Sequence, residues 1–265
     1  NVAFHATQLG LEGRVVSRLG ADEDGCALRA ELEGLGLDLT FVQEDPKRPT
    51  GRVTVDASDP THPVFTIHED AAWDHLAADT AMDRLAQAAG AVCFGTLAQR
   101  HETTRETIHA FLARADTVIR VYDVNLRQSF YDAAWIERSL QAADVVKLNA
   151  EEAEVVGTLL GLDASTPREL AAGFAARFGV GLTCVTRADR GCILVEDGRI
   201  ADVPGEEVEV ADAVGAGDAF TAALIASRLE GLDLEAAARR ANRFGALVAS
   251  RPGAMPVVRE GGITS

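Results

Sequence analysis

Short apolar runs alternate along the chain with longer stretches in which apolar residues recur every three or four positions. The short runs are rich in β-branched residues and predict strands, whereas the longer stretches predict amphipathic helices. The predicted strands are residues 14–19, 91–95, 117–124, 144–148, 181–186 and 192–196. The predicted helices are residues 25–33, 80–89, 103–113, 133–142, 151–160, 168–178, 216–229 and 234–249. Because strands and helices alternate, we expect a three-layer α/β fold in which helices flank a mostly parallel central sheet.

Residues 39–68 do not follow this alternation of strands and helices. They contain three stretches that alternate in the strand period between proline-containing turns, namely 39–43, 51–56 and 63–68. No helical pattern separates these stretches, so we expect a small antiparallel β lid that projects from the parallel sheet. The unpaired edge of such a lid can pair with a second copy, which predicts a homodimer. The expected organisation is one α/β domain, residues 1–38 and 69–265, with a β lid of residues 39–68.

The first residues of the chain predict a helix, 2–9, that ends at Gly10. A helix alone does not begin a sheet, because its apolar face must pack against strands or helices formed by other residues. We therefore expect the N-terminal strand of the fold to lie upstream of this numbering.

The chain has 265 residues and a formal charge of −16, from 25 Lys and Arg against 41 Asp and Glu. Nucleic acid and anionic membranes both require a basic face, so we expect neither as a partner. No run approaches the roughly 18 apolar residues of a membrane span and no export signal is recognisable, so we expect a cytoplasmic protein. The cysteines form no CxxC pair, and we expect them to be small buried apolar residues: Cys26, Cys93, Cys184 and Cys192.

The segment 211–220, ADAVGAGDAF, is the most informative part of the chain. Gly215, Ala216 and Gly217 have no bulky side chains, so their backbone N–H groups can converge on one point. The predicted helix that follows adds about half a positive charge at its N-terminus. We therefore predict an anion hole, for which phosphate is the best candidate. Asp218 would repel an anion, and we interpret it as the general base that accepts a proton from an attacking hydroxyl.

A plainer interpretation of the same segment is a tight turn with a capping aspartate. A strand-like run, 208–211, and five or six βα units precede it, so the segment is not the first-turn fingerprint of a dinucleotide site. No GxGxxG or GxxxxGK[ST] motif occurs in the chain. A dinucleotide-binding oxidoreductase is the second enzyme class, but the early turn, 9–13, lacks its glycine pattern.

Residues 212–220 resemble the DTxGAGDxF signature of the ribokinase-like (PfkB) carbohydrate kinases, with Ala213 where threonine is usual. The resemblance covers essentially the whole chain, and residues 1–3 are similar to the end of the family's N-terminal glycine-pair signature. It implies a ribokinase-like fold with a β lid over the sugar, and phosphorylation of a sugar hydroxyl by ATP with Mg²⁺. It also implies that Asn1 and Asp218 bind the sugar.

Two further motifs extend the resemblance, the first to the fructokinase and ketodeoxygluconate kinase branch of that family and the second to the family as a whole. Residues 123–127, DVNLR, resemble its DxNxR segment, whose arginine, here Arg127, borders the sugar pocket. Residues 147–152, KLNAEE, resemble the family's NxxE motif through Asn149 and Glu152, which implies roles in organising magnesium and phosphate. A carboxylate at the C-terminal edge of a strand can hold a divalent cation through waters. The alternative is a capping box at a helix start, and both roles are compatible.

Residues 186–191, TRADRG, resemble the family's TxGxxG turn at the nucleotide, with Ala188 in place of the first glycine. The residues that the resemblance implies at ATP are Asn149, Thr186, Ala188, Gly191, Gly217 and Asn242. Asn242 lies inside the last predicted helix, where a role in helix packing is an equal alternative.

Residues 251–254, RPGA, resemble the family's C-terminal loop, which can hold a monovalent cation such as potassium. The resemblance implies that Gly253 of this loop and the carbonyl groups of Asp212 and Val214 form the site.

These features predict an ATP-dependent, fructokinase-like sugar kinase whose small-molecule partners are a sugar and ATP. Ribokinase, 2-keto-3-deoxygluconate kinase and nucleoside kinase activities stay open as alternatives. A noncatalytic nucleotide-binding regulatory module stays open too, because Ala213 and Ala188 depart from the family pattern. An active enzyme is favoured over such a module, because Gly217, Asp218 and the NxxE motif match the family pattern.

Overall fold

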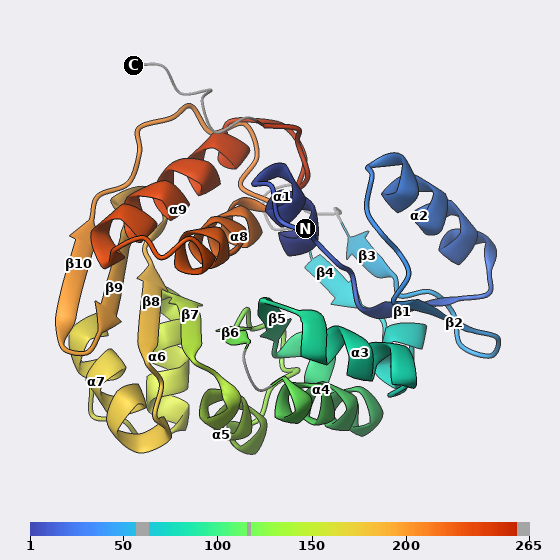
Figure 1. Cartoon of the computed structure of the whole chain (residues 1–265), viewed down its shortest axis with the longest axis horizontal. Helices are drawn as coiled ribbons and strands as arrows, with labels where there is room; N and C mark the ends of the chain where they lie inside the picture. The colour runs from blue at the N-terminus through green and yellow to red at the C-terminus, as the bar shows by residue number, and fades with distance from the viewer. Residues whose placement is uncertain (57–63, 116–117, 259–265) are drawn as a thin grey trace. The chain divides into compact units, whose positions relative to one another are not determined.

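The computed structural model describes residues 1–56, 64–115 and 118–258 (Figure 1). The chain forms two compact units, which are described separately. The first unit comprises Asn1–Gly13, Gln87–Leu97 and Ala115–Ser265, and the second comprises Arg14–Ala86 and Ala98–Arg114. Residues 57–63 of the predicted lid and residue 117 of the predicted third strand lie outside the described residues.

A six-stranded sheet forms the centre of the first unit, in the order β10-β9-β8-β7-β6-β5. Its strands are β5 (Ala91–Gly95), β6 (Ile119–Asp123), β7 (Val145–Asn149), β8 (Leu182–Thr186), β9 (Cys192–Glu196) and β10 (Arg199–Val203). The strands from β5 to β8 run parallel, which confirms the predicted mostly parallel sheet. The last two strands run antiparallel to their neighbours.

The structure corrects the prediction at the end of this sheet. Residues 208–211 form no strand: the N–H groups of Ala211 and Asp212 donate to the carbonyl of Ala249. Strand β10 was not predicted, although the Asp197-Gly198 pair before it is a hairpin signal. Both residues have positive φ, +48° and +74°, as a two-residue type I′ turn requires.

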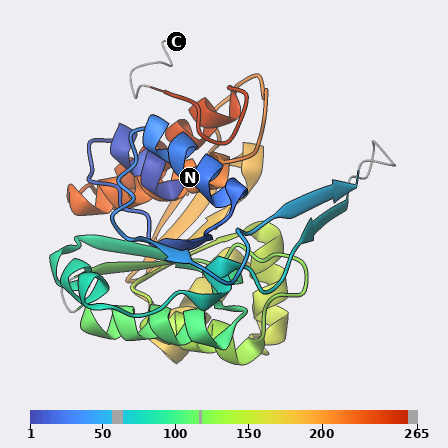
Figure 2. The same ribbon diagram turned by 90° about the vertical axis from the view of Figure 1, so that its right-hand side faces the viewer.

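Helices cover both faces of the six-stranded sheet (Figures 1 and 2). The helices of the first unit are α1 (Val2–Gln8), α5 (Ala133–Ala142), α6 (Ala150–Leu159), α7 (Pro167–Phe178), α8 (Ala216–Leu229) and α9 (Leu234–Ala249). Helices α1, α8 and α9 lie on one face, and α5, α6 and α7 lie on the other, which confirms the three layers (Figure 1). Among the described residues, no helix combines the length and the apolar character needed to cross a membrane.

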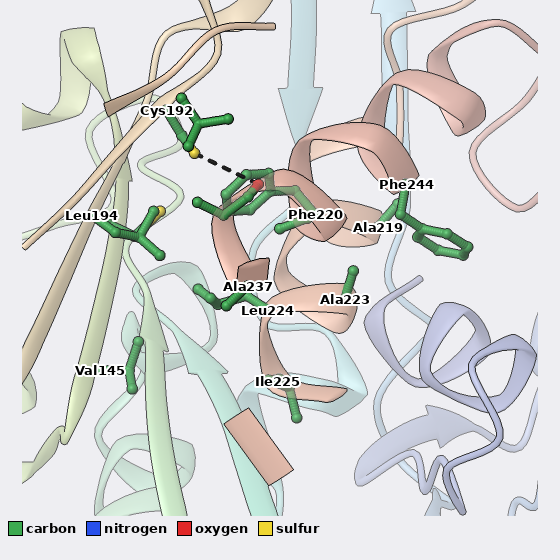
Figure 3. Packing of buried hydrophobic residues seen from close by; sticks show 14 of the residues in the cluster. Val145, Cys192, Leu194, Ala219, Phe220, Ala223, Leu224, Ile225, Ala237 and Phe244 are labelled. Atoms are coloured by element: carbon green, nitrogen blue, oxygen red, sulfur yellow. Dashed lines mark hydrogen bonds between the residues drawn. The ribbon is translucent and has the colours of Figure 1, made fainter. Parts of the chain in front are cut away.

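The core between the sheet and α8 and α9 combines large apolar side chains with several alanines (Figure 3). Ala219, Ala223 and Ala237 are fully buried, and such small residues let the two helices pack closely on each other and on the sheet. Cys184 and Cys192 belong to this core, as predicted for buried cysteines, and burial raises the pKa of Cys192 to about 12. The same expectation is wrong for Cys26, which is exposed on a helix surface, and Cys93 is half-buried.

The second unit contains two small sheets. Strand β1 (Ser17–Gly20) pairs in parallel with β2 (Val42–Asp45), and β3 (Val53–Asp56) pairs antiparallel with β4 (Val64–Ile67). Its helices are α2 (Glu23–Gly34), α4 (Glu102–Arg114), the short η1 (Ala72–His75) and most of α3 (Thr80–Ala88).

The antiparallel part of the predicted flap is confirmed by β3 and β4, which extend away from the rest of their unit (Figure 2). Two predicted strands of this unit are present, as β1 and β2, but their pairing differs from the prediction. The strand expected at 14–19 does not join the six-stranded sheet, and the strand expected at 39–43 is β2, which lies parallel to β1 instead of inside the flap. Helix α2 lies between these two strands in the chain, and a crossover helix is what permits parallel pairing.

Candidate active site

The loop before α8 turns sharply at Gly215. This residue has φ +84°, a left-handed conformation that favours glycine, and it is the N-cap of α8. A Cβ atom at this position would lie 2.3 Å from the carbonyl oxygen of Ala254, so packing also requires glycine. The N–H of Ala216 donates to the carbonyl of Ala213 at 3.3 Å. The predicted anion hole therefore depends chiefly on the N–H groups of Gly215 and Gly217 and on the helix dipole.

Asp218 lies in the first turn of α8, where it meets a residue from the other end of the chain. The side-chain Nδ2 of Asn1 donates a hydrogen bond of 2.7 Å to Oδ2 of Asp218. Helix α1 packs against α8, and this contact brings the two residues together across 217 positions of sequence. The predicted sugar-binding amide and the predicted general base thus form one polar group, with Asn1 exposed and Asp218 half-buried.

A buried charged network lies against the same loop. The Nζ of Lys147 on β7 lies 3.0 and 3.2 Å from the two carboxylate oxygens of Asp123 on β6. The hydroxyl of Thr221 on α8 lies 2.8 Å from Oδ2 of Asp123 and 3.0 Å from the carbonyl oxygen of Gly217, so its single hydrogen can be donated to either. A Cβ atom at Gly217 would lie 3.4 Å from Nζ of Lys147. The network therefore connects two strands of the sheet to the turn that begins α8.

Burial alone would lower the pKa of Lys147, but the Asp123 carboxylate outweighs it and holds that pKa above its ordinary value. Lys147 and Asp123 lie inside the KLNAEE and DVNLR motifs, which gave no reason to expect this ion pair. The signal was available, because a charged residue within a strongly apolar strand, such as VVKLN, is almost always paired.

The NxxE motif forms a capping box, as the alternative interpretation expected. Oδ1 of Asn149 accepts the N–H of Glu152, and Oε2 of Glu152 accepts the N–H of Asn149, both at 2.8 Å. Oε1 of Glu152 also accepts the N–H of Leu126 at 2.9 Å, so this buried carboxylate fixes the DVNLR turn to the end of β7. No cluster of three or more His, Cys, Asp or Glu that could hold a metal occurs within residues 1–56, 64–115 and 118–258.

The other predicted sugar residue, Arg127, is exposed beyond the end of β6. Its guanidinium donates to the carbonyl of Leu126 at 3.0 Å. The chain reaches this position through Asn125, which has a positive φ of +41°. Contact between Arg127 and a sugar stays a prediction.

The predicted nucleotide turn keeps a glycine-type backbone without its first glycine. Ala188 has φ +54°, in the left-handed region that favours glycine, and Gly191 has φ +83°. A Cβ atom at Gly191 would lie 2.0 Å from the carbonyl oxygen of Val203, so glycine is required there. Thr186 Oγ1 donates to the carbonyl of Leu148 at 3.4 Å, which ties the turn to β7.

Asn242 on α9 is buried, and its Nδ2 donates to the carbonyl groups of Val203 and Pro204 at 3.3 and 3.0 Å. This is the packing role that the sequence left open, and it holds the chain that follows β10 against α9. A contact between Asn242 and the nucleotide stays a prediction.

The residues predicted to hold a monovalent cation lie together. One carboxylate oxygen of Asp212 accepts the N–H of Val214 at 2.9 Å, and the other accepts the N–H of Gly253 at 3.1 Å. Gly253 has φ +82°, which favours glycine at this bend. The Asp212 side chain therefore fastens the C-terminal loop to the loop before α8.

Known proteins resemble the chain over almost its entire length. The family described as pfkB family carbohydrate kinase matches residues 1–260. A Pyrococcus horikoshii protein named as a sugar kinase is 29% identical over 277 residues, which cover 98% of this chain and 82% of the relative. An Escherichia coli fructokinase is 27% identical over 272 residues, which cover 100% of this chain and 86% of the relative.

Solved structures give the same picture. The crystal structure of an uncharacterized sugar kinase from Pyrococcus horikoshii in complex with ATP has a TM-score of 0.83 at 27% identity, and covers 99% of this chain and 85% of that one. A protein named as ribokinase II from Escherichia coli, in complex with ATP and Mg²⁺, has a TM-score of 0.84 at 22% identity, with 98% and 85% covered. At that identity the likeness shows the fold alone, which is ribokinase-like.

Proposed function

Because the chain belongs to the pfkB family of carbohydrate kinases, we propose that it transfers the terminal phosphoryl group of ATP to a sugar hydroxyl, with a fructokinase-like substrate. The observation that carries this proposal is the hydrogen bond of 2.7 Å between Asn1 and Asp218 at the N-terminus of α8. It places a hydrogen-bonding amide and a proton acceptor next to a glycine turn suited to phosphate.

In this reaction Asp218 orients the sugar hydroxyl and accepts its proton as the oxygen attacks in line. The N–H groups of Gly215 and Gly217, with the dipole of α8, stabilise the negative charge on the transferred phosphoryl group. Asn1 holds one carboxylate oxygen of Asp218 in place, which leaves the other for the substrate.

Mg²⁺ suits the oxygen donors of the NxxE motif. The chemistry that Mg²⁺ would supply here is to offset the negative charge of the phosphate groups. The residues that would hold it are Asn149 and Glu152, at the C-terminal end of β7. Each carboxylate oxygen of Glu152 accepts one backbone hydrogen, so each keeps a lone pair for water around the cation.

The sugar itself is proposed from the DVNLR segment and from the fructokinase relatives. Ribose, 2-keto-3-deoxygluconate and nucleosides are the alternatives, and the Salmonella enterica kinase of aminoimidazole riboside shares the fold. A panel of ketoses, aldoses, sugar acids and nucleosides, followed by ADP release, decides among them. ATP consumption with fructose above all others supports the proposal, and consumption with none would favour a noncatalytic regulatory module.

The general base is tested by Asp218→Asn, which keeps the shape of the side chain and removes its basicity. We expect kcat to fall by about 10²-fold or more, with the KM for ATP within about threefold of the wild-type value. The matched control is Glu235→Gln, a carboxylate-to-amide change at an exposed position on α9, with kcat unchanged. Near-normal turnover in Asp218→Asn would contradict the assignment.

We also propose that the β3–β4 ribbon forms a homodimer interface. Val53, Val55 and Phe65 are 56%, 50% and 55% exposed. They share one face of the ribbon, because Val55 and Phe65 are cross-strand partners and Val53 lies two residues from Val55. Sedimentation velocity tests the proposal: the wild type sediments as a dimer, and Val55→Ser/Phe65→Ser as a monomer. A monomeric wild type at micromolar concentration contradicts it.

A potassium site formed by Gly253 with the carbonyl groups of Asp212 and Val214 is a further part of the proposal. It predicts a faster reaction in potassium than in tetramethylammonium salts at equal ionic strength. Equal rates in the two salts would contradict it.

A further inference from the structure

The orientation of the Gln8 side chain is fixed by its surroundings. Its Oε1 accepts the N–H of Val258 at 2.7 Å, and a backbone N–H can only donate. The amide nitrogen must therefore occupy the other position, where Nε2 lies 3.2 Å from the carbonyl oxygen of Pro256 and 3.2 Å from Nδ1 of His5. The two hydrogens of this amide serve these two acceptors.

This orientation determines the protonation of His5, one turn earlier on α1. Because the Gln8 amide nitrogen can only donate, Nδ1 of His5 must accept, and the ring hydrogen must be on Nε2. Nε2 lies 3.0 Å from the carbonyl oxygen of Ala254, so the ring donates to that carbonyl. The imidazole is fully buried, edge to face with the rings of Phe4 and Phe244. Burial lowers the pKa of His5, although the Ala254 carbonyl and Asp218 oppose this shift, so the ring is neutral near pH 7.

The carbonyl that accepts from His5 belongs to the residue that packs against the Gly215 turn. A Cβ atom at Gly215 would lie 2.3 Å from the Ala254 oxygen and 2.8 Å from its Cα. The backbone of Ala254 is thus in direct contact with the residue that begins α8 and contributes an N–H to the proposed anion hole. The same short helix carries Asn1 at its N-cap, bonded to Asp218, and His5 one turn later.

We propose that His5, held as the neutral Nε2–H tautomer by Gln8 and the Ala254 carbonyl, is a positioning residue that fixes Ala254 against Gly215 and so sets the direction of the anion-hole N–H groups. The inference rests on the proposed kinase function of the same site. His5 is fully buried, and in this proposal it acts only through the backbone of residues 254 and 215.

The tautomer can be measured without any activity. The ¹⁵N chemical shifts of the His5 ring in the full-length wild-type chain at pH 7.5 should show a protonated Nε2 and an unprotonated Nδ1. In Gln8→Leu the Ala254 carbonyl, which can only accept, still favours the hydrogen on Nε2, so the same tautomer should persist. A wild-type ring that carries its hydrogen on Nδ1, or that is an imidazolium, would overturn the proposal.

The effect on the anion hole is measured with His5→Phe, which keeps a ring and loses the donor, and His5→Gln, whose amide can still donate to Ala254. In His5→Phe we expect kcat to fall by about tenfold or more, because small displacements of preorganised donors have large effects on rate. The KM for the sugar should stay within about threefold. His5→Gln should restore most of kcat, and Thr7→Ala, a control on the same helix whose hydroxyl donates only to Ala3, should behave as the wild type.

Binding of ADP with aluminium fluoride, compared with ADP alone, separates positioning from general loosening. His5→Phe should weaken the fluoride complex at least about fivefold more than it weakens ADP, since only the former uses the anion hole fully. Equal weakening of both, or a His5→Gln variant no better than His5→Phe, would overturn the proposal. If the wild type phosphorylates no sugar, the proposed function fails, whereas the tautomer and the two binding constants still decide the role of His5.

Discussion

Substituting Lys147 by methionine removes one partner of a buried ion pair and keeps the length of the side chain. The side chains of Lys147 and Asp123 are only 8% and 7% exposed, and Nζ lies 3.0 Å from the nearer carboxylate oxygen. Loss of one partner leaves the other charge without compensation in a site that water scarcely reaches. Such changes destabilise proteins by about 3 to 5 kcal/mol. Because both side chains are almost fully buried, solvent screens little of this electrostatic cost.

The pH dependence of this contribution has a definite sign. Because Asp123 raises the pKa of Lys147, the stabilisation is fully present below the unfolded pKa of ~10.4 and is lost only as pH rises through the folded value. The difference in unfolding free energy between the wild type and Lys147→Met should therefore stay constant between about pH 6 and pH 9.

Urea denaturation followed by circular dichroism measures the effect. The only other lysine of the chain, Lys47, is exposed, and Lys47→Met is the matched control, with a change within about 0.5 kcal/mol. In the double variant Asp123→Leu/Lys147→Met the loss should be smaller than the sum of the two single losses by at least about 1 kcal/mol. A Lys147→Met variant within about 1 kcal/mol of the wild type would refute the reasoning.

Three further outcomes are expected. Ala188→Gly should raise the unfolding free energy by up to about 1 kcal/mol, because glycine relieves the left-handed backbone at φ +54°; a loss of stability in urea denaturation would count against this. Under native conditions a thiol reagent should modify Cys26 first and leave Cys184 and Cys192 unmodified, whereas all react in denaturant, and mass spectrometry of the labelled peptides identifies the sites. The lowered pKa of His5 stabilises the fold above the unfolded value of ~6.5, and this part is lost as pH falls through the folded pKa. Thermal melts from pH 7.5 to 5 should thus show a steeper acid loss in the wild type than in His5→Gln, and equal slopes would contradict the assignment.

The sequence predicted well those elements whose pattern is local. Strands β5 and β7 match their predicted ranges within one residue, because a buried parallel strand is a short run of β-branched and other apolar residues. Strand β10 was missed because it lies at the sheet edge, and its sequence RIADV mixes Arg199 and Asp202 with apolar residues in no regular period. The alternating run 208–211 was taken for a strand, but no strand pairs with it. The hydrophobic pattern also does not show which strands pair or in which direction. Strand β2 pairs with β1, an earlier strand outside the predicted flap.

Those parts of the candidate site that a single short segment forms by itself could be predicted from the sequence. The glycine turn at Gly215 and the capping box of Asn149 and Glu152 are of this kind. The contacts of Asp123 with Lys147 and Thr221 join three elements, so no single motif displays them. The arrangement of His5 and Gln8 could not be predicted, because it depends on a backbone N–H 250 positions after Gln8.

The dependence of α1 on residues far along the chain has a consequence for biosynthesis. Asn1, His5 and Gln8 bond to partners 217, 249 and 250 positions later. During translation this helix is made well before the residues to which its polar groups bond, so these contacts form only after the later segments have been synthesised. A nascent chain interrupted short of residue 254 lacks the carbonyl that accepts from His5 and the N–H that donates to Gln8, so two of these three contacts of α1 form only when the C-terminal segment has been made.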